Sequence, residues 1–261
     1  MKTNHEIDYK ITGEEMQCVE IELDPQETVI SEPGSFMLMD DGIKMETLFG
    51  DGSGQEGGIM GKLFSAGKRL LTGENLFMTT YTNSTGGKKR VTFAAPYPGK
   101  IIPLDLSVLK GKMICQKDSF LCAAKGVSVG IEFQRKLGTG LFGGEGFIMQ
   151  KLEGDGMAFV HAGGHIIERE IKERELLKID TGCIVAFTSS INYDIQFVGG
   201  IKNTIFGGEG LFYATLTGPG KVWIQSIPIS RLADRILQFG RGARKEEGSI
   251  LGGLGNLIDG N

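Results

Sequence analysis

The sequence repeats itself, and this internal repetition constrains the fold more than any other feature. The letters GGEGFI at residues 143–148 return as GGEGLF at 207–212, 64 residues further along the chain. A weaker third copy lies nearer the N-terminus, where Gly-Glu recurs at 73–74 and the run SFML at 35–38 parallels SFLC at 119–122. The chain therefore reads as three tandem copies of one unit of about 65 residues, a period typical of repeat architectures.

Composition and charge restrict the class of protein. Of the 261 residues, 40% are hydrophobic and 23% are charged, which is ordinary for a globular protein. The formal net charge of −4 at pH 7 argues against a general binder of nucleic acid. No run of about 18 apolar residues occurs, and residues 1–20 are polar without an apolar signal core. We therefore expect a cytoplasmic protein.

The four cysteines form no metal-binding or redox motif. Cys18, Cys115, Cys122 and Cys183 each lie in an apolar, strand-like run, and no two of them form a Cys-x-x-Cys pair. Free cysteine packs as a small hydrophobic residue. We therefore predict four buried free thiols.

Most of the chain has the pattern of β-structure. Short runs rich in β-branched and aromatic residues alternate apolar and polar positions, and Gly, Pro, Asn or Asp bound them. Many strands at intervals of about 10 residues indicate a sandwich or a barrel. The predicted strands are residues 27–30, 36–39, 43–49, 91–94, 101–106, 120–124, 127–133, 147–152, 157–161, 184–188, 193–198, 211–216 and 222–227.

We predict an all-β protein of three tandem units with a C-terminal helix. Ser230 is the predicted N-cap of that helix, and Leu232, Ile236 and Phe239 form an apolar stripe that ends at Gly240. The predicted organisation is a first unit at 1–98 with an inserted helical loop at 50–72, a second unit at 99–164, a third unit at 165–228, and the helix with a Gly-rich tail at 229–261.

The insertion in the first unit is the predicted interaction surface. Segment 59–71 places apolar side chains, Leu63 and Phe64 among them, close to one helical face, and its cations, including Lys68 and Arg69, lie elsewhere. A short basic amphipathic helix packs on its own core, docks on a partner or lies on an anionic membrane surface. We predict self-association or docking, because the other two copies have no such segment.

The Gly-Glu step of the repeats is predicted to be structural. Three equivalent carboxylates form a site for a hard cation or an acid–base pair, or they accept hydrogen bonds from backbone N–H groups in a tight turn. We favour the turn, because every copy needs a fold-forming contact whereas an active site is needed only once. The residues are Gly73 and Glu74, Gly144 and Glu145, and Gly208 and Glu209.

No catalytic, cofactor-binding or metal-binding residue is assigned from motifs. Residues 52–57 match G-x-G-x-x-G, but no parallel βαβ unit follows them. His161 and His165 stand four apart with two glycines between them, and no third histidine is within reach for zinc ligation. No G-x-S-x-G elbow occurs. We therefore expect no cofactor and no metal.

Five runs, in their combination and order, resemble one protein family. They are KRLLTGENLF, GLFGGEGF, DTGCIVAF, TIFGGEGLF and GPGKVWIQS, at residues 68–77, 140–147, 180–187, 204–212 and 218–226. Over residues 5–230 the chain is similar to the altered inheritance of mitochondria protein 24 family. The resemblance implies a fold related to the tryptophan RNA-binding attenuation protein, with three β-sandwich units of double-stranded β-helix type. RNA and tryptophan binding do not transfer with a fold, and the family supplies no established catalytic residue.

The repeats, the net charge and the family resemblance together predict a non-catalytic scaffold or protein-interaction protein. One version of this hypothesis places the protein at the periphery of a membrane. Its expected partners are proteins or further copies of itself in a homo-oligomer, with no nucleic acid. The alternative is an enzyme or small-ligand-binding protein with a site between repeats. Perturbed carboxylates that converge in a deep apolar pocket would favour this alternative.

Overall fold

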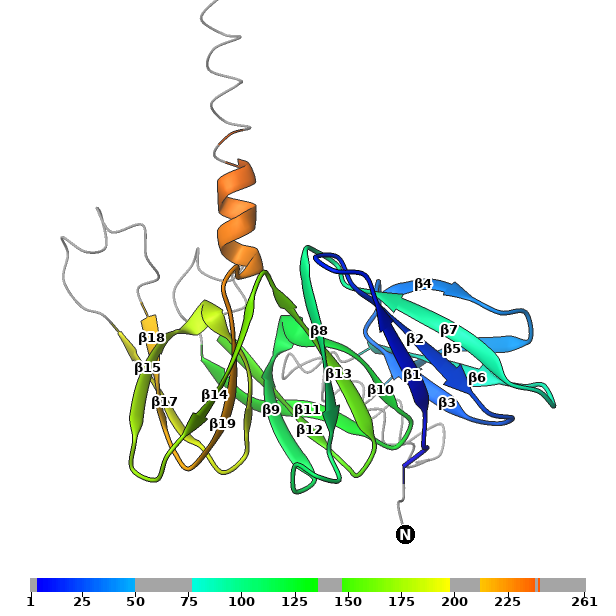
Figure 1. Ribbon diagram of the computed structural model, residues 1–261, viewed down its shortest axis with the longest axis horizontal. Coiled ribbons are helices and arrows are strands. Elements are labelled where there is room, and N and C mark those ends of the chain that lie inside the picture. The colour runs from blue at the N-terminus through cyan, green and yellow to red at the C-terminus, as the bar shows by residue number, and fades with distance from the viewer. Residues whose placement is uncertain (1–3, 50–76, 136–146, 198–211, 238, 240–261) are drawn as a thin grey trace, which may run out of the picture.

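The computed structural model describes most of the chain (Figure 1), namely residues 4–49, 77–135, 147–197, 212–237 and 239. These residues form four sheets of antiparallel strands, one α-helix at 229–237 and two 3₁₀ helices, η1 (Lys117–Ser119) and η3 (Thr181–Cys183). The predicted all-β class, with three tandem β-sandwich units and a C-terminal helix, is confirmed.

The strands follow one another in three groups. The first group consists of β1 (Asp8–Thr12), β2 (Cys18–Leu23), β3 (Thr28–Ser31), β4 (Phe36–Met39), β5 (Ile43–Phe49), β6 (Phe77–Asn83) and β7 (Lys89–Ala94). The second consists of β8 (Gly99–Asp105), β9 (Lys112–Gln116), β10 (Phe120–Ala124), β11 (Ser128–Arg135), β12 (Phe147–Glu153) and β13 (Met157–Gly163). The third consists of β14 (Ile166–Ile171), β15 (Leu176–Asp180), β16 (Ile184–Thr188), β17 (Asn192–Phe197), β18 (Phe212–Thr217) and β19 (Gly220–Gln225).

Each unit contributes strands to two sheets in the same order. In the second unit, β8, β13 and β10 are neighbours in one sheet, and β11, β12 and β9 are neighbours in the other. The third unit repeats this with β14, β19 and β16 and with β17, β18 and β15. The first unit does so with β2, β7 and β4 and with β5, β6 and β3, and β1 is added outside β2. Hence β4, β10 and β16 are equivalent strands, and so are β3, β9 and β15.

A shared irregularity supports this equivalence. The pairing of β4 with β7 shifts register between Phe36 and Leu38. The pairing of β10 with β13 shifts between Phe120 and Cys122, and that of β16 with β19 shifts just after Ile184. A β-bulge inserts one extra residue and bends the strand. All three equivalent strands therefore carry the same bend one residue after their start.

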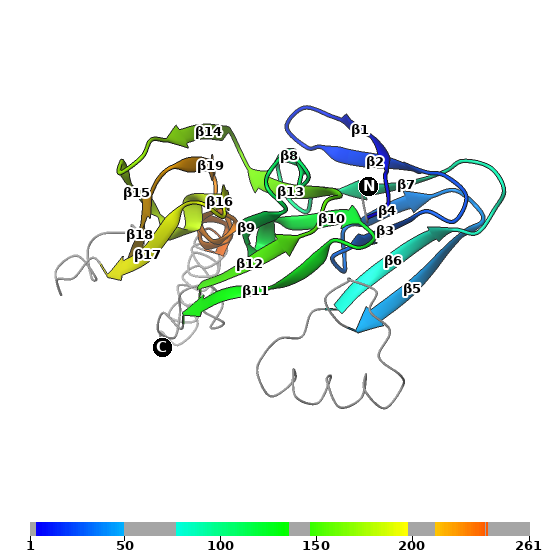
Figure 2. The same cartoon turned by 90° about the horizontal axis from the view of Figure 1, so that it is seen from below.

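The units are joined by strand pairing, so each inner sheet belongs to two units. Strand β3 pairs with β10 with Ser31 opposite Cys122, and β9 pairs with β16 with Cys115 opposite Ala186. Each joint creates a six-stranded sheet, and Figure 2 shows the units side by side. The sequence of β10, FLCAA, lacks polar alternation because both faces of this central strand are buried.

The hydrophobic core also passes through the joints. Val29 of the first unit packs in one cluster with Leu121 of the second, and Ile114 of the second packs in another with Ile184 of the third. Units of this size bury too little surface to be secure alone. The predicted unit boundaries stay predictions, because only separately expressed units would test them.

Two local predictions need correction. Cys115 and Cys122 are buried free thiols as expected, but Cys18, the first residue of β2, and Cys183, just before β16, are only half-buried. The helix begins at residue 229, so Ser230 lies inside it and is not the N-cap. Figure 1 shows the helix projecting from the sandwiches. Ile236 and Phe239 are exposed. No helix in the described part of the chain is long and apolar enough to cross a membrane.

Candidate interaction surface

The site residues predicted from the sequence lie outside the described residues. Segment 50–76 contains the predicted interaction surface of Leu63, Phe64, Lys68 and Arg69, and it also contains the first Gly-Glu step. Segments 136–146 and 198–211 contain the other two steps. By sequence, the three segments connect β5 to β6, β11 to β12 and β17 to β18, which are equivalent positions in the three units. The roles given to these residues, and the membrane contact, stay predictions.

Strand β4 exposes an apolar surface among the described residues. Phe36, Met37, Leu38 and Met39 are all exposed, Met37 to 55% and Leu38 to 48%. Every residue of the equivalent strand β10 is buried, as are the first four of β16. The apolar character of the three strands is the same, so their position in the sheet makes the difference. Strands β10 and β16 lie inside six-stranded sheets, whereas β4 is the last strand of its sheet.

An apolar strand at a sheet edge can bind another chain through its free backbone groups and through its exposed apolar side chains. Within the described residues, β7 is the strand that pairs with β4, so the backbone groups on the other side of β4 face outward. Such a row of N–H and C=O groups is a template for another strand, and proteins usually protect it with charges or bulges. The bulge of β4 lies at its start, and the strand itself carries no charge. We therefore identify Phe36–Met39 as the β4 edge.

Strand β15 has the complementary position at the other end of the molecule. It is the outer strand of the three-stranded sheet β15-β18-β17, whereas its equivalents β3 and β9 lie inside six-stranded sheets. Leu176 is 55% exposed, and Lys178 is also exposed. The positions equivalent to Lys178 hold Ile30 and Ile114, which are buried in the joints. Figure 1 shows β15 in the unit at one end and β4 in the unit at the other. We call Leu176–Asp180 the β15 edge.

Other strands also lie at sheet edges, but for a different reason. The equivalent strands β5, β11 and β17 are outer strands in all three units. The same holds for β8 and β14, and β1 is the outer strand beside β2 in the first unit. These edges follow from the order of the strands within each unit. Among the described residues, β4 and β15 are the edge strands whose equivalents form the joints between units.

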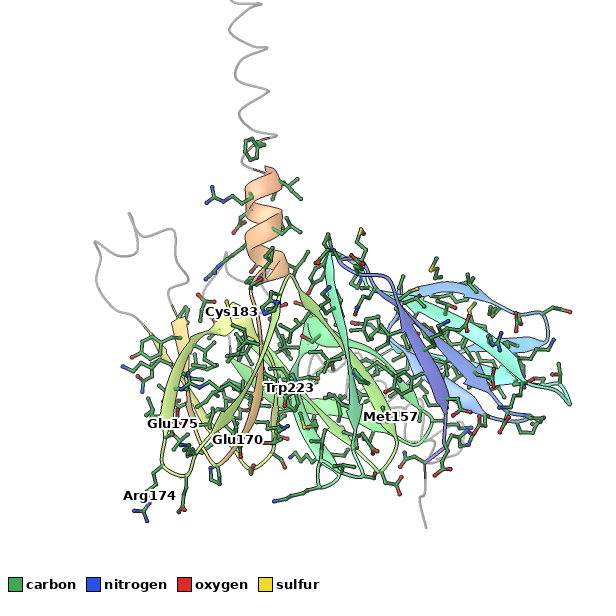
Figure 3. All side chains as sticks on the ribbon, viewed as in Figure 1. Met157, Glu170, Arg174, Glu175, Cys183 and Trp223 are labelled. Atoms are coloured by element: carbon green, nitrogen blue, oxygen red, sulfur yellow. The ribbon has the colours of Figure 1, made fainter. Side chains whose placement is uncertain are left out.

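A charged turn lies next to the β15 edge. Residues 169, 170 and 172–175 line an open depression of about 690 Å³. Arg169 Nη2 donates to Glu175 Oε1 at 2.7 Å, and Lys172 N donates to Glu175 Oε2 at 2.9 Å. The Lys172 N–H and then the Arg169 guanidinium lower the pKa of Glu175. Figure 3 shows Arg174 pointing away from the molecule beside Glu175. These contacts fix the turn between β14 and β15.

Another group of perturbed residues lies where the first and second units meet. Burial raises the pKa of Glu32, just after β3, to about 7, and the charge of Asp118, just before β10, adds to the rise. Burial lowers the pKa of His161 on β13 to about 4. The Tyr97 ring meets the His161 ring edge-on, with 4.3 Å between centroids. Within the described residues no three His, Cys, Asp or Glu side chains gather as metal ligands.

Comparison with known proteins places this architecture in a family. The sequence model of the family described as Mitochondrial biogenesis AIM24 matches residues 9–227, from β1 to just past β19. The chain belongs to the AIM24 family. An uncharacterized protein of Streptococcus pyogenes serotype M6 is 29% identical over 225 residues, which cover 85% of this chain and 86% of that protein. The X-ray crystal structure of a Streptococcus pyogenes protein matches with a TM-score of 0.70 and 23% identity, covering 89% of this chain and 99% of that one.

The sequence contained a partial signal for the β4 edge of this AIM24 chain. The likeness of 35–38 to 119–122 shows that β4 has the residues of a strand that is buried in the second unit. The likeness defines the repeat, but it does not reveal which copy of the strand lacks a neighbour. The β15 edge was missed, because the alternation in Leu176–Asp180 is weak and the strand itself was not predicted.

Glu32 provides a test of whether burial explains the perturbed group at the joint. Its folded-state pKa of about 7 lies above its ordinary value of 4.5, so stability falls as the pH rises from 4.5 to 7. We expect Glu32→Gln to raise the free energy of unfolding at pH 8 by about 1 kcal/mol, allowing for the partial exposure of the side chain, and to leave it unchanged at pH 4. Urea unfolding at the two pH values measures this. Glu173→Gln, at an exposed carboxylate, is the control, and equal effects of both variants would contradict the assignment.

Proposed function

We propose that this AIM24 chain is a non-catalytic scaffold of the cytoplasm that binds protein chains at the β4 edge and the β15 edge. One observation carries the proposal, namely that Phe36–Met39 expose the apolar side chains that their equivalents bury. An exposed edge strand binds an added strand through main-chain hydrogen bonds, and pockets for the side chains give specificity. The proposal includes self-association into a homo-oligomer.

The interior of the molecule supports edge pairing as the mode of binding. The joints β3–β10 and β9–β16 both use antiparallel pairing between the same two strand types. Both joints are continuous with hydrophobic clusters that include residues from two units. A further strand at the β4 edge would therefore meet backbone geometry and an apolar surface of a kind that already holds two units together.

The described charged groups support a binding role more than the enzymatic alternative. In the depression at residues 169–175, Arg169 and Lys172 both donate to Glu175, which stabilises the turn. Burial accounts first for the raised pKa of Glu32 and for the lowered pKa of His161. Perturbed groups mark functional sites only when they converge on a pocket.

The test compares two charge substitutions of exposed apolar residues. Leu38→Lys places a charge on the β4 edge, and Val108→Lys places one in an exposed turn of the second unit. In fresh extract of cells that make the protein at its natural level, we expect the wild-type chain to migrate well above its own 28.2 kDa. Leu38→Lys should migrate as a folded monomer, whereas Val108→Lys should behave as wild type.

Two outcomes would overturn the proposal. The first is a wild-type chain that migrates as a free 28.2 kDa monomer in fresh extract. The second is a Leu38→Lys complex of unchanged size. Circular dichroism and urea unfolding of the purified variants show whether each has folded, so that loss of a complex is not confused with loss of the fold.

A further inference from the structure

We propose that the chain paired with the β4 edge is a second copy of this protein, which contributes its β15 edge. This inference rests on the proposed function and names the partner. In both internal joints, the β4-type strand of one unit pairs with the β3-type strand of the unit before it. Among the described residues, β4 has no strand of the β3 type beside it, and β15 has no strand of the β4 type beside it.

The pairing has to occur between copies. Figures 1 and 2 both show β15 in the unit at one end of the molecule and β4 in the unit at the other. A copy therefore pairs its β4 with the β15 of the next copy, head to tail. Head-to-tail contacts are heterologous and produce a closed ring or an open filament, whereas a two-fold dimer joins identical surfaces.

The internal joints determine the register. Cys122 lies opposite Ser31 and Ala123 opposite Ile30, and Ala186 and Phe187 repeat this with Cys115 and Ile114. The matching bulges make Leu38 and Met39 the equivalents of these β10 and β16 residues. The pairing of β15 with β18 repeats that of β9 with β12, which makes Lys178 and Ile179 the equivalents of Ile114 and Cys115. Hence Leu38 pairs with Ile179 and Met39 with Lys178.

The charges at the two edges are compatible with this register. Lys178 is a charged residue at a position that holds a buried isoleucine in both internal joints. Its Nζ lies 5.1 Å from the centre of the Tyr213 ring on β18, so the ammonium group lies over its own sheet. On the partner copy, Asp40 and Asp41 directly follow Met39 and provide counter-charges. Lysine at this edge also hinders pairing with other strands.

The end sheets are completed by the pairing. The four-stranded sheet β1-β2-β7-β4 of one copy and the three-stranded sheet β15-β18-β17 of the next become one continuous sheet. The four exposed apolar side chains of the β4 edge and the exposed Leu176 then lie at a joint of the internal type. The pairing therefore accounts for both unusual edges with one contact.

Disulfide trapping with two separately purified variants tests the register. Met39→Cys and Lys178→Cys replace exposed side chains. The equivalent internal pair exchanges main-chain hydrogen bonds, with Lys125 N bonded to Thr28 O two residues further along. Such pairs have Cα atoms about 5.5 Å apart, within the range for a disulfide. With oxidised glutathione we expect a covalent dimer when the two variants are mixed, and no such product from either variant alone.

The matched control moves one thiol along the same face of β15. Leu176→Cys is also exposed but lies two residues from Lys178, so its Cα would be more than about 7 Å from that of residue 39. We expect the mixture of Met39→Cys and Leu176→Cys to give at least ten-fold less dimer. The native cysteines are present in every mixture. The dimer that they form is measured in the single-variant samples and subtracted.

Each other outcome overturns the inference. Equal trapping of both mixtures would mean contact without the register, and a Met39→Cys homodimer would mean a two-fold β4–β4 pairing. Absence of trapping, with both thiols open to maleimide, would mean that copies do not pair at these edges. If maleimide cannot reach the new thiol of monomeric Met39→Cys, the rest of the chain covers β4. If trapping fails but Leu38→Lys still converts the complex in extract to a monomer, the scaffold proposal stands. The protein that binds the β4 edge is then a different chain.

Discussion

Leu121→Asp is expected to unfold the protein at 25 °C, whereas Met37→Asp, at the equivalent position of the first unit, is expected to leave it folded. Leu121 is 2% exposed within the β3–β10 joint, and Met37 is 55% exposed on the β4 edge. Removing a buried leucine side chain costs about 2–5 kcal/mol, and burying an unpaired carboxylate costs several kcal/mol more. The sum of these two costs approaches the free energy of unfolding of a typical domain, which is about 5–15 kcal/mol.

Far-ultraviolet circular dichroism and urea unfolding of dilute protein measure this difference. In dilute solution association contributes little to stability, so the change in the free energy of unfolding for Met37→Asp should stay within about 0.5 kcal/mol. Leu121→Ala is the control that removes the side chain without adding a charge, and it should lose about 2–5 kcal/mol. A strong loss of stability in Met37→Asp would show that the β4 edge is covered within the monomer.

His161→Leu is expected to protect the protein against acid. His161 is 1% exposed on β13, and burial holds its pKa at about 4. The unfolded state takes up a proton at about 6.5 and the folded state only near 4, so folding stability is lost as the pH falls through this interval. The loss amounts to about 3 kcal/mol at pH 4, and the leucine variant should not show it.

The measurement is the urea midpoint of wild type and variant between pH 7.5 and pH 4. The two curves should separate progressively below about pH 6.5. His165→Leu is the matched control, because His165 is exposed in the turn after β13. Its replacement removes a histidine without changing a buried group. Equal acid sensitivity of wild type and His161→Leu would show that other groups cause the loss.

The sequence was sufficient for the class of fold and for most strands. Runs such as Phe120–Ala124 and Phe147–Glu153 were predicted because apolar residues fill both faces or alternate clearly. Strands β1, β2, β6, β9, β14 and β15 were not predicted. Two of them illustrate the cause: Ile166–Ile171 is mostly exposed, Leu176–Asp180 is exposed at two of its five positions, and both carry charges. Hydrogen bonding to β19 and β18 makes them strands, and this long-range pairing is not visible in local composition.

The sequence alone determined that three related sandwich units follow one another, because the Gly-Glu step and its neighbouring apolar positions recur in each copy. It did not determine which copies of a strand are buried. Phe36–Met39 and Phe120–Ala124 are both apolar runs, yet one is exposed and the other is buried. Burial depends on whether a neighbouring strand supplies backbone partners and side chains, and only the order of strands in the tertiary structure decides that. For this reason the interaction surface predicted at Leu63–Arg69 stays a prediction, while the β4 and β15 edges could be identified only from the sheets.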